Sequence, residues 1–174
     1  MKRPYWFALL AIVAAVAGGC GRSETEATVD SAPAFTEPVQ AQPRLATTRL
    51  WLGPEQLTTE MAVTTRQIIT GMMFRTNILE NEGMIFVLGT PQPAHFWMKN
   101  CFVPLSVAYI DPDGAILEIH DLQPHNTNTV DSASRNVAFA LETAQGWFTR
   151  HNIREGVRVR TDRGSLDQMF SRNR

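Results

Sequence analysis

Six residues in the central part of the chain have side chains that could bind a ligand or take part in a reaction. Two are cations, two are acids, and the others are an amide and an indole: Arg75, Glu82, Trp97, Lys99, Asn100 and Glu142. Lys99 and Asn100 stand inside an almost unbroken apolar run, where an unpaired buried charge or amide would cost several kcal/mol. These side chains must therefore find polar partners inside the fold or line a cleft.

If the six side chains converge, they suit a small anionic or glycan-type ligand. Arg75 and Lys99 could contact a carboxylate or phosphate, Asn100 could orient a carbonyl or hydroxyl, and a tryptophan could stack on a sugar ring. Ligand binding is the function that the sequence favours. The alternative is a buried polar network that only stabilises the fold, in a structural or protein-interaction module.

An enzyme acting on an envelope component is a weaker hypothesis. Lys99 and Glu142 could exchange protons with a substrate if burial moves their pKa values toward neutrality. Glu82 and Glu142 could also form a carboxylate pair of the kind used in glycoside hydrolysis. However, no serine lies in a Gly-x-Ser-x-Gly turn. Cys101 has no base beside it in the sequence, and we expect a buried, unreactive thiol.

Metal binding is only weakly indicated. The segment after a predicted hairpin carries four potential ligands, which His95 could join in space: His120, Asp121, His125 and Asp131. Their spacing matches none of the tight zinc signatures, and segments of this composition are usually solvated turns. We therefore expect no metal and no cofactor.

Residues 1–19 predict an export signal, because two basic residues precede an apolar run too short for the roughly 20 residues of a membrane span. Two processing sites remain open, cleavage after Ala17 and a lipobox that ends at Cys20. We favour the lipobox, in which the Cys20 thiol carries a lipid and the protein is anchored to a membrane of the bacterial cell envelope. Gly21 after Cys20 favours the periplasmic side of the outer membrane.

Composition divides the remainder of the chain. Residues 20–43 are polar and proline-containing, which predicts a flexible tether behind the lipid. Residues 44–170 predict one globular domain, polar after Asp162 and expected to fray there, and residues 171–174 a frayed tail. The chain has 16 Lys+Arg and 17 Asp+Glu, which argues against the basic face of a nucleic-acid binder. The oligomeric state is left open.

Short strands separated by turns predict a mainly β domain. Strands are expected at residues 47–52, 61–64, 83–88, 106–110, 115–120, 136–143 and 157–161. The sequence Asp-Pro-Asp-Gly at residues 111–114 is typical of a type I turn and predicts a hairpin. One short helix is expected after a cap at Thr64 or Thr65, and another from Thr143 or Ala144, with Trp147 and Phe148 on its buried side.

Four blocks of this domain occur in a fixed order: TGMMFR at 70–75, EGMIF at 82–86, FWMKN with PL at 96–105, and ALE with GW at 140–147. They resemble the signature of the family catalogued as domain of unknown function 192 (DUF192), over about residues 57–161. The resemblance implies a mainly β (α+β) fold, with a mixed or antiparallel sheet curled toward a barrel and two or three short helices. It implies no established activity, and members are commonly exported. Ser106 and Val157 stand where many members have Asp.

Overall fold

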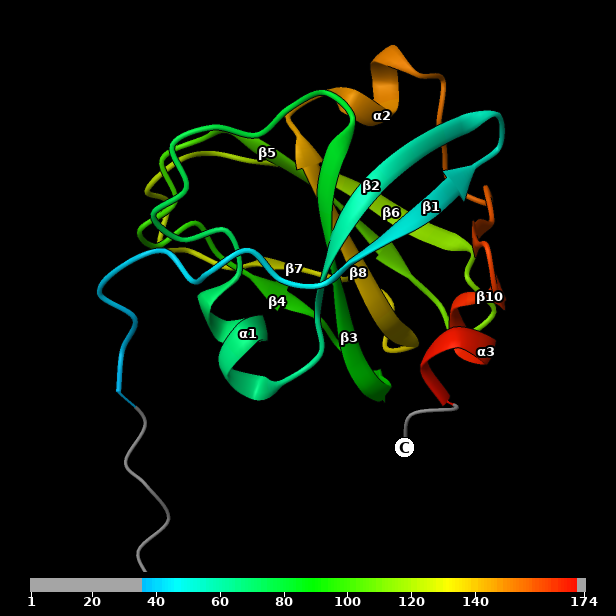
Figure 1. Cartoon of the computed structure of the whole chain (residues 1–174), viewed down its shortest axis with the longest axis horizontal. Helices are drawn as coiled ribbons and strands as arrows, with labels where there is room; N and C mark the ends of the chain where they lie inside the picture. The colour runs from blue at the N-terminus through cyan, green and yellow to red at the C-terminus, as the bar shows by residue number, and fades with distance from the viewer. Residues whose placement is uncertain (1–35, 172–174) are drawn as a thin grey trace, which may run out of the picture. The chain divides into compact units, whose positions relative to one another are not determined.

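A computed structural model describes residues 36–171 and places one mixed sheet at the centre of the fold (Figure 1). The strands follow the order β10-β9-β1-β2-β3-β8-β5-β6, in which β2 and β3 are parallel and all other neighbours antiparallel. Their bounds are β1 Thr47–Leu52, β2 Glu55–Ala62, β3 Glu82–Gln92, β5 Leu105–Ile110, β6 Ile116–Leu122, β8 Val137–Ala144, β9 Val159–Thr161 and β10 Gly164–Ser165. A separate antiparallel pair joins β4 (His95–Phe96) to β7 (Val130–Asp131).

The prediction of a mainly β fold with short helices is confirmed, but the expected curling of the sheet into a barrel is wrong. Strands β10 and β6 are the two edges of the sheet and do not pair with each other. One isolated bridge, Ala115 to Arg158, connects the turn before β6 with the residue before β9. Because β9 and β10 have only three and two residues, they are too short to extend this bridge into a closing ladder.

Helix α1 (Thr65–Thr70) begins as expected, with Thr64 as its cap. The Thr64 side chain accepts from Gln67 N, and the Gln67 side chain accepts from Thr64 N at 3.0 Å, which together form a capping box. Helix α1 belongs to the crossover between the parallel strands β2 and β3 (Figure 1). A connection of this kind is what parallel neighbours require.

The other two helices differ from the prediction. Helix α2 (Trp147–Arg150) begins later than expected, because β8 continues to Ala144 and the left-handed Gly146 (φ 74°) makes the turn. Trp147 and Phe148 are buried, as predicted. The chain does not fray after Asp162 but forms β10 and then α3 (Leu166–Ser171), which buries Leu166, Met169 and Phe170.

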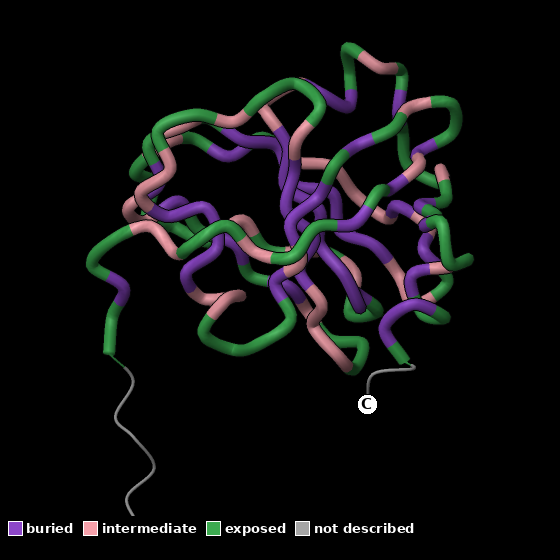
Figure 2. The backbone as a smooth tube through the Cα atoms, in the orientation of Figure 1, coloured by how far each residue is buried: buried purple, intermediate pink, exposed green. Residues whose placement is uncertain are grey.

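The central strands are buried on both faces, so the core has two parts (Figure 2). One face packs against α2 and α3, through residues such as Trp147, Leu166 and Phe170. The opposite face packs against Met72 and Met73, which follow α1, and against Phe96 of β4. Each face is therefore covered by different short elements, and a polar residue on either face must lie within a packed layer.

The N-terminal predictions fall mostly outside the described residues: the signal at 1–19, Cys20 and the tether as far as residue 35. Within the described part, Gln42 donates from Nε2 to the carbonyls of Gln67 and Gly71, at 3.2 and 2.9 Å. The segment around Gln42 thus lies against α1. Between residues 36 and 171, no helix has the length and apolar character needed to cross a membrane.

Candidate ligand-binding cavity

Glu142 is an acid held inside the sheet. Strand β8 places it opposite Met84 of β3 and Val107 of β5, so the three side chains share one face. Only 4% of Glu142 is exposed, and no hydrogen bond or ion pair of its carboxyl is found within residues 36–171. Burial raises the pKa of this carboxyl to about 8, because a charged group is poorly solvated there. A lone buried acid of this kind is a candidate functional group.

Glu142 lines a cavity of about 550 Å³, a size within the range of small-molecule sites. The cavity lies between α1, the segment after it, β3 and β4, and its wall is formed by Thr65, Ile68, Ile69, Thr70, Gly71, Met72, Met73, Phe86, Leu88, Gln92, Pro93, Ala94, His95, Phe96, Trp97, Cys101 and Glu142. Phe86 and Phe96 meet edge to face with ring centres 5.0 Å apart. No lysine or arginine is among these lining residues. The cavity is therefore apolar and aromatic, with one acid.

Cys101 shares this cavity with Glu142 but is not activated. The thiol is free and buried, as predicted. Burial, and then the charge of Glu142, raises the pKa of Cys101 to about 12. Because the thiolate is the nucleophile, a thiol with this pKa is unreactive at neutral pH.

A histidine–aspartate pair stands at the edge of the same cavity. The β4–β7 pairing places His95 opposite Asp131, and His95 Nδ1 lies 2.8 Å from Asp131 Oδ1. The bond with His95 is the main reason that the pKa of Asp131 is lowered. With Nδ1 directed at the carboxylate, Nε2 is the nitrogen left to accept a proton or bind a ligand. Sequence reasoning considered His95 only as a metal ligand and missed this pairing.

Arg75 and Glu82 belong to a different cluster, whose centre is Glu60. Glu60 accepts from Arg75 Nη2 at 3.0 Å, from Arg44 Nη1 at 2.8 Å and from the backbone N–H of Leu45 at 2.7 Å. Arg44 also lies 3.6 Å from Glu82 Oε2. The side chains of Arg75 and Glu60 are only 11% and 6% exposed. Arg75 is thus neutralised by an acid that the sequence analysis did not identify.

Lys99 and Asn100 also have partners of their own. Lys99 Nζ lies 2.5 Å from the Glu37 carboxylate and 5.5 Å from the centre of the Trp97 ring. Asn100 adopts a left-handed conformation (φ 58°), and its carbonyl accepts from Phe74 N at 2.7 Å. Asn100 therefore forms a turn, a role for which asparagine is well suited.

The six predicted residues do not converge on one site. Trp97 and Glu142 line the cavity, Arg75 and Glu82 belong to the Glu60 cluster, and Lys99 pairs with Glu37. In the described part of the chain, no group of three or more His, Cys, Asp or Glu residues could hold a metal. The predicted loop residues have other contacts, since His120 lies 3.0 Å from Glu118 and Asp121 accepts from Ser106 at 2.5 Å.

The sequence profile of DUF192, described as "Uncharacterized ACR, COG1430", matches residues 49–161, more than half of the chain. The chain belongs to the DUF192 family. Its match includes Glu60, Glu142 and all the lining residues of the Glu142 cavity, but ends before Asp162 and α3. No match is found in a comparison with curated proteins.

Several solved structures resemble this DUF192 protein, and two of them are crystal structures of bacterial proteins. One is a protein of Sinorhizobium meliloti 1021 described as a putative transcription regulator, with 33% identity, a TM-score of 0.65, and coverage of 69% of this chain and 97% of that chain. The other is a protein of unknown function from Novosphingobium aromaticivorans DSM 12444, with 27% identity, a TM-score of 0.65, and coverage of 72% and 93%. The fold is thus shared by proteins without an established activity.

Proposed function

We propose that this DUF192 protein binds a small organic cation with an apolar body in the cavity lined by Glu142. The observation that supports this proposal is an unpaired carboxyl at the inner wall of an aromatic cavity. An ammonium group would supply the missing partner, and aromatic faces such as those of Phe86 and Phe96 favour a cation. The apolar remainder of the ligand would gain free energy by leaving water.

The geometry favours a cation over the small anion or glycan suggested by the sequence. Arg75 is paired with Glu60 and Lys99 with Glu37, so neither cation is directed into the cavity. An ionised Glu142 would repel an anionic ligand in a medium of low dielectric constant. A neutral, hydroxyl-bearing ligand would instead require Glu142 in its protonated form, as a hydrogen-bond donor.

Proton linkage distinguishes these two ligand classes. Since the pKa of Glu142 in the free protein is about 8, a cation must displace the proton from the carboxyl when it binds near neutral pH. Its affinity should therefore rise with pH up to about 8 and then level off. A neutral ligand that accepts a hydrogen bond from the protonated carboxyl should show the opposite trend.

Three probes of matched shape test the proposal: phenethylamine, phenethyl alcohol and phenylacetate. We expect calorimetry to detect binding of the amine, tighter at pH about 8 than at about 6, with release of a proton. Glu142→Gln should weaken amine binding by roughly tenfold or more, since the charge is lost inside an apolar site. The control Glu155→Gln removes an exposed acid that does not line the cavity and should bind the amine normally.

Other results would reject the cation. Tighter binding of phenethyl alcohol than of the amine, with affinity falling as pH rises, would make Glu142 a neutral donor. Preferential binding of phenylacetate would support the anionic ligand that the sequence predicted. If the three probes bind with equal affinity, and Glu142→Gln binds them as tightly as the original protein does, then the Glu142 carboxyl does not determine which ligand the cavity binds.

A second candidate function is acid–base catalysis on an envelope component. It is favoured by the His95–Asp131 hydrogen bond at the edge of the cavity that holds Glu142. His95 would serve as the base and protonated Glu142 as the acid, so Lys99 no longer has a role. Product formation from envelope extract, followed by mass spectrometry and lost in both His95→Gln and Glu142→Gln, would establish this activity. Amine binding without turnover would argue for a binding protein.

A nucleic-acid role is not proposed, although one similar structure is described as a putative transcription regulator. The chain has a net charge of −1. Several of its arginines face carboxylates, including Arg44, Arg75 and Arg150. Binding to phosphates requires a surface of unpaired cations.

A further inference from the structure

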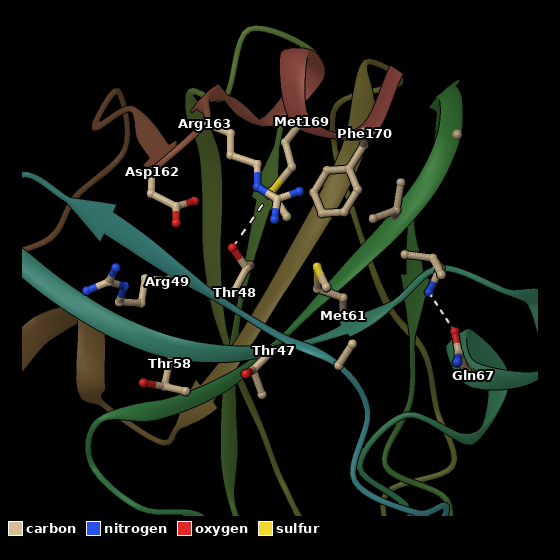
Figure 3. A pocket seen from close by; sticks show the side chains of 14 residues that line it. Thr47, Thr48, Arg49, Thr58, Met61, Gln67, Asp162, Arg163, Met169 and Phe170 are labelled. Carbon is tan, nitrogen blue, oxygen red and sulfur yellow. Dashed lines mark hydrogen bonds between the residues drawn. The ribbon is translucent and has the colours of Figure 1, made fainter. Parts of the chain in front are cut away.

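A second cavity lies on the opposite side of the sheet from Glu142, beneath α3 (Figure 3). Its volume is about 640 Å³, and its lining comes from β1 and the residue before it, β2 and the residue after it, α1, β3 and the C-terminal part of the described chain: Ala46, Thr47, Thr48, Arg49, Thr58, Met61, Val63, Gln67, Val87, Gly89, Asp162, Arg163, Met169 and Phe170. Several of these residues follow the end of the family match at residue 161. This cavity is therefore built in part by elements outside the matched region.

One wall of this cavity is apolar. Met169 and Phe170 of α3 face Met61 of β2 across it (Figure 3). Val87 of β3 also lines the cavity. Met61 and Val87 are partly buried and pack against the core of this side. The Thr48 hydroxyl donates to Met169 Sδ at 3.7 Å, so this polar group already has a partner. The part of an occupant that lies against this wall would thus contact methyl, thioether and phenyl groups.

Arg163 gives this apolar cavity a cationic rim. It lies in the turn between β9 and β10, where its backbone N–H donates to Thr161 Oγ1 at 3.0 Å. Its side chain extends over the cavity toward Thr48 (Figure 3). No ion pair of the Arg163 guanidinium is found among the described residues. The turn thus presents an available planar donor above an apolar wall.

The other charges at the rim leave it net positive. Asp162 is adjacent to Arg163, and Arg49 lies on β1, so the rim has two cations and one anion. Arg49 Cζ lies 5.6 Å from the centre of the Trp51 ring, which holds this guanidinium to its own strand. Arg163 is therefore the cation best placed to bind an occupant of the cavity.

We propose that this second cavity binds a small carboxylate with an apolar body, such as a medium-chain fatty acid. The carboxylate would accept hydrogen bonds from the Arg163 guanidinium, whose planar fork suits two oxygens. The chain would lie against Met61, Met169 and Phe170. This site is independent of the proposed cation site, because it lies on the other face of the sheet and has a net cationic rim, whereas the first cavity has an acid at its inner wall.

Methionine methyl groups report on the two cavities separately. Met61 and Met169 line the second cavity, whereas Met72 and Met73 line the cavity of Glu142. We expect decanoate, added to protein with ¹³C-labelled methionine methyls, to shift the NMR signals of Met61 and Met169 and to leave those of Met72 and Met73 in place. Decanol is the uncharged control and should bind more weakly.

Variants test the role of the arginine. Arg163→Gln should weaken decanoate binding about tenfold with little effect on decanol, whereas Arg163→Lys should give an intermediate affinity, since it keeps the charge and loses the planar fork. Arg154→Gln removes another exposed arginine, outside both cavities, and should have no effect. Decanoate binding should weaken with added salt.

Several results would overturn the proposal. These are the absence of Met61 and Met169 shifts at millimolar decanoate, shifts at Met72 and Met73 instead, and equal affinities for decanoate and decanol. An unchanged dissociation constant in folded Arg163→Gln protein would also overturn it. Glu142→Gln should leave decanoate binding unchanged, so the failure of one site is distinguishable from the failure of the other.

Discussion

The charge state of Glu142 should make the stability of the domain depend on pH. The folded-state pKa of about 8 lies above the ordinary value of 4.5, so between these values the folded protein holds a proton that the unfolded chain releases. The free energy of unfolding should therefore fall as pH rises from about 4.5 to about 8, and level off above that. Each pKa unit corresponds to about 1.4 kcal/mol, so the loss amounts to a few kcal/mol.

Glu142→Gln should remove this dependence, because an amide has nearly the same shape and does not ionise. Denaturant unfolding of both proteins across this pH range provides the measurement. We expect similar stabilities near the acid end and a more stable variant near pH about 8. A constant difference between the two proteins at every pH would contradict the assignment of the raised pKa to Glu142.

Glu60 should be more important for stability than the acids on the surface of the same strand. Its carboxylate accepts from two arginines and one backbone N–H. Glu60→Gln would leave Arg75 buried without a counter-charge, and we expect a loss of about 2–4 kcal/mol in the free energy of unfolding. Glu55→Gln, which changes an acid paired with His151 at 3.0 Å on the surface, should cost less than about 1 kcal/mol. Equal effects of the two substitutions would refute a special role for the Glu60 cluster.

The sequence identified some residues of the site but could not supply their partners. Glu142 and Trp97 were predicted as site residues, and both line the cavity. Arg75 was predicted to contact a ligand or to join a buried polar network, but its partner Glu60 lay outside the predicted strands and was not identified. The partner of Lys99 is Glu37, in a segment predicted to be a flexible tether. Pairings between residues far apart in sequence depend on register and packing, which composition does not specify.

At the scale of elements, the predictions succeeded where local patterns were strong. Strand β1 and the β5–β6 hairpin match the prediction closely, because apolar alternation and the turn residues specify them. Strand β2 was mostly missed, since Thr, Glu and Gln occupy many of its positions. Helix α3 was missed because its apolar residues are few and polar residues surround them. Both elements are stabilised by tertiary packing that overrides a weak local preference.

The close approach of β3 and β8 should make Gly83 sensitive to substitution. A Cβ at Gly83 would lie 2.8 Å from the carbonyl oxygen of Glu142, so the two strands must move apart. We expect Gly83→Ala to lower the free energy of unfolding by about 1–3 kcal/mol and to weaken phenethylamine binding, since β8 carries Glu142.

A glycine in open space provides the comparison for Gly83. Gly53 has φ +61° and no heavy atom within 4 Å of an added Cβ. Gly53→Ala should therefore cost only backbone strain, about 1 kcal/mol, and leave amine binding unchanged. If Gly83→Ala behaves like Gly53→Ala in both measurements, the packing of β3 on β8 does not position Glu142.

At the scale of the whole described domain, the mixed sheet separates two cavities of different character. Strand β3 contributes to both, because alternate side chains point to opposite faces: Phe86 lines the cavity of Glu142 and Val87 the cavity beneath α3. The cavity of Glu142 contains a lone acid, and the cavity beneath α3 has a net cationic rim. The proposed ligands are therefore opposite in charge, and we expect each to bind without displacing the other.

The proposed attachment of the chain to a membrane rests on Cys20, which lies outside the described residues. If Cys20 carries a lipid, Cys20→Ala should move the protein from the membrane fraction to the soluble periplasmic fraction, because the acyl chains supply most of the membrane affinity. The measurement is fractionation with immunoblotting, supported by labelling with an alkyne fatty acid that the variant should not incorporate. Glu155→Gln is the control and should stay in the membrane fraction. A Cys20→Ala protein that remains there with unchanged mobility would exclude lipidation.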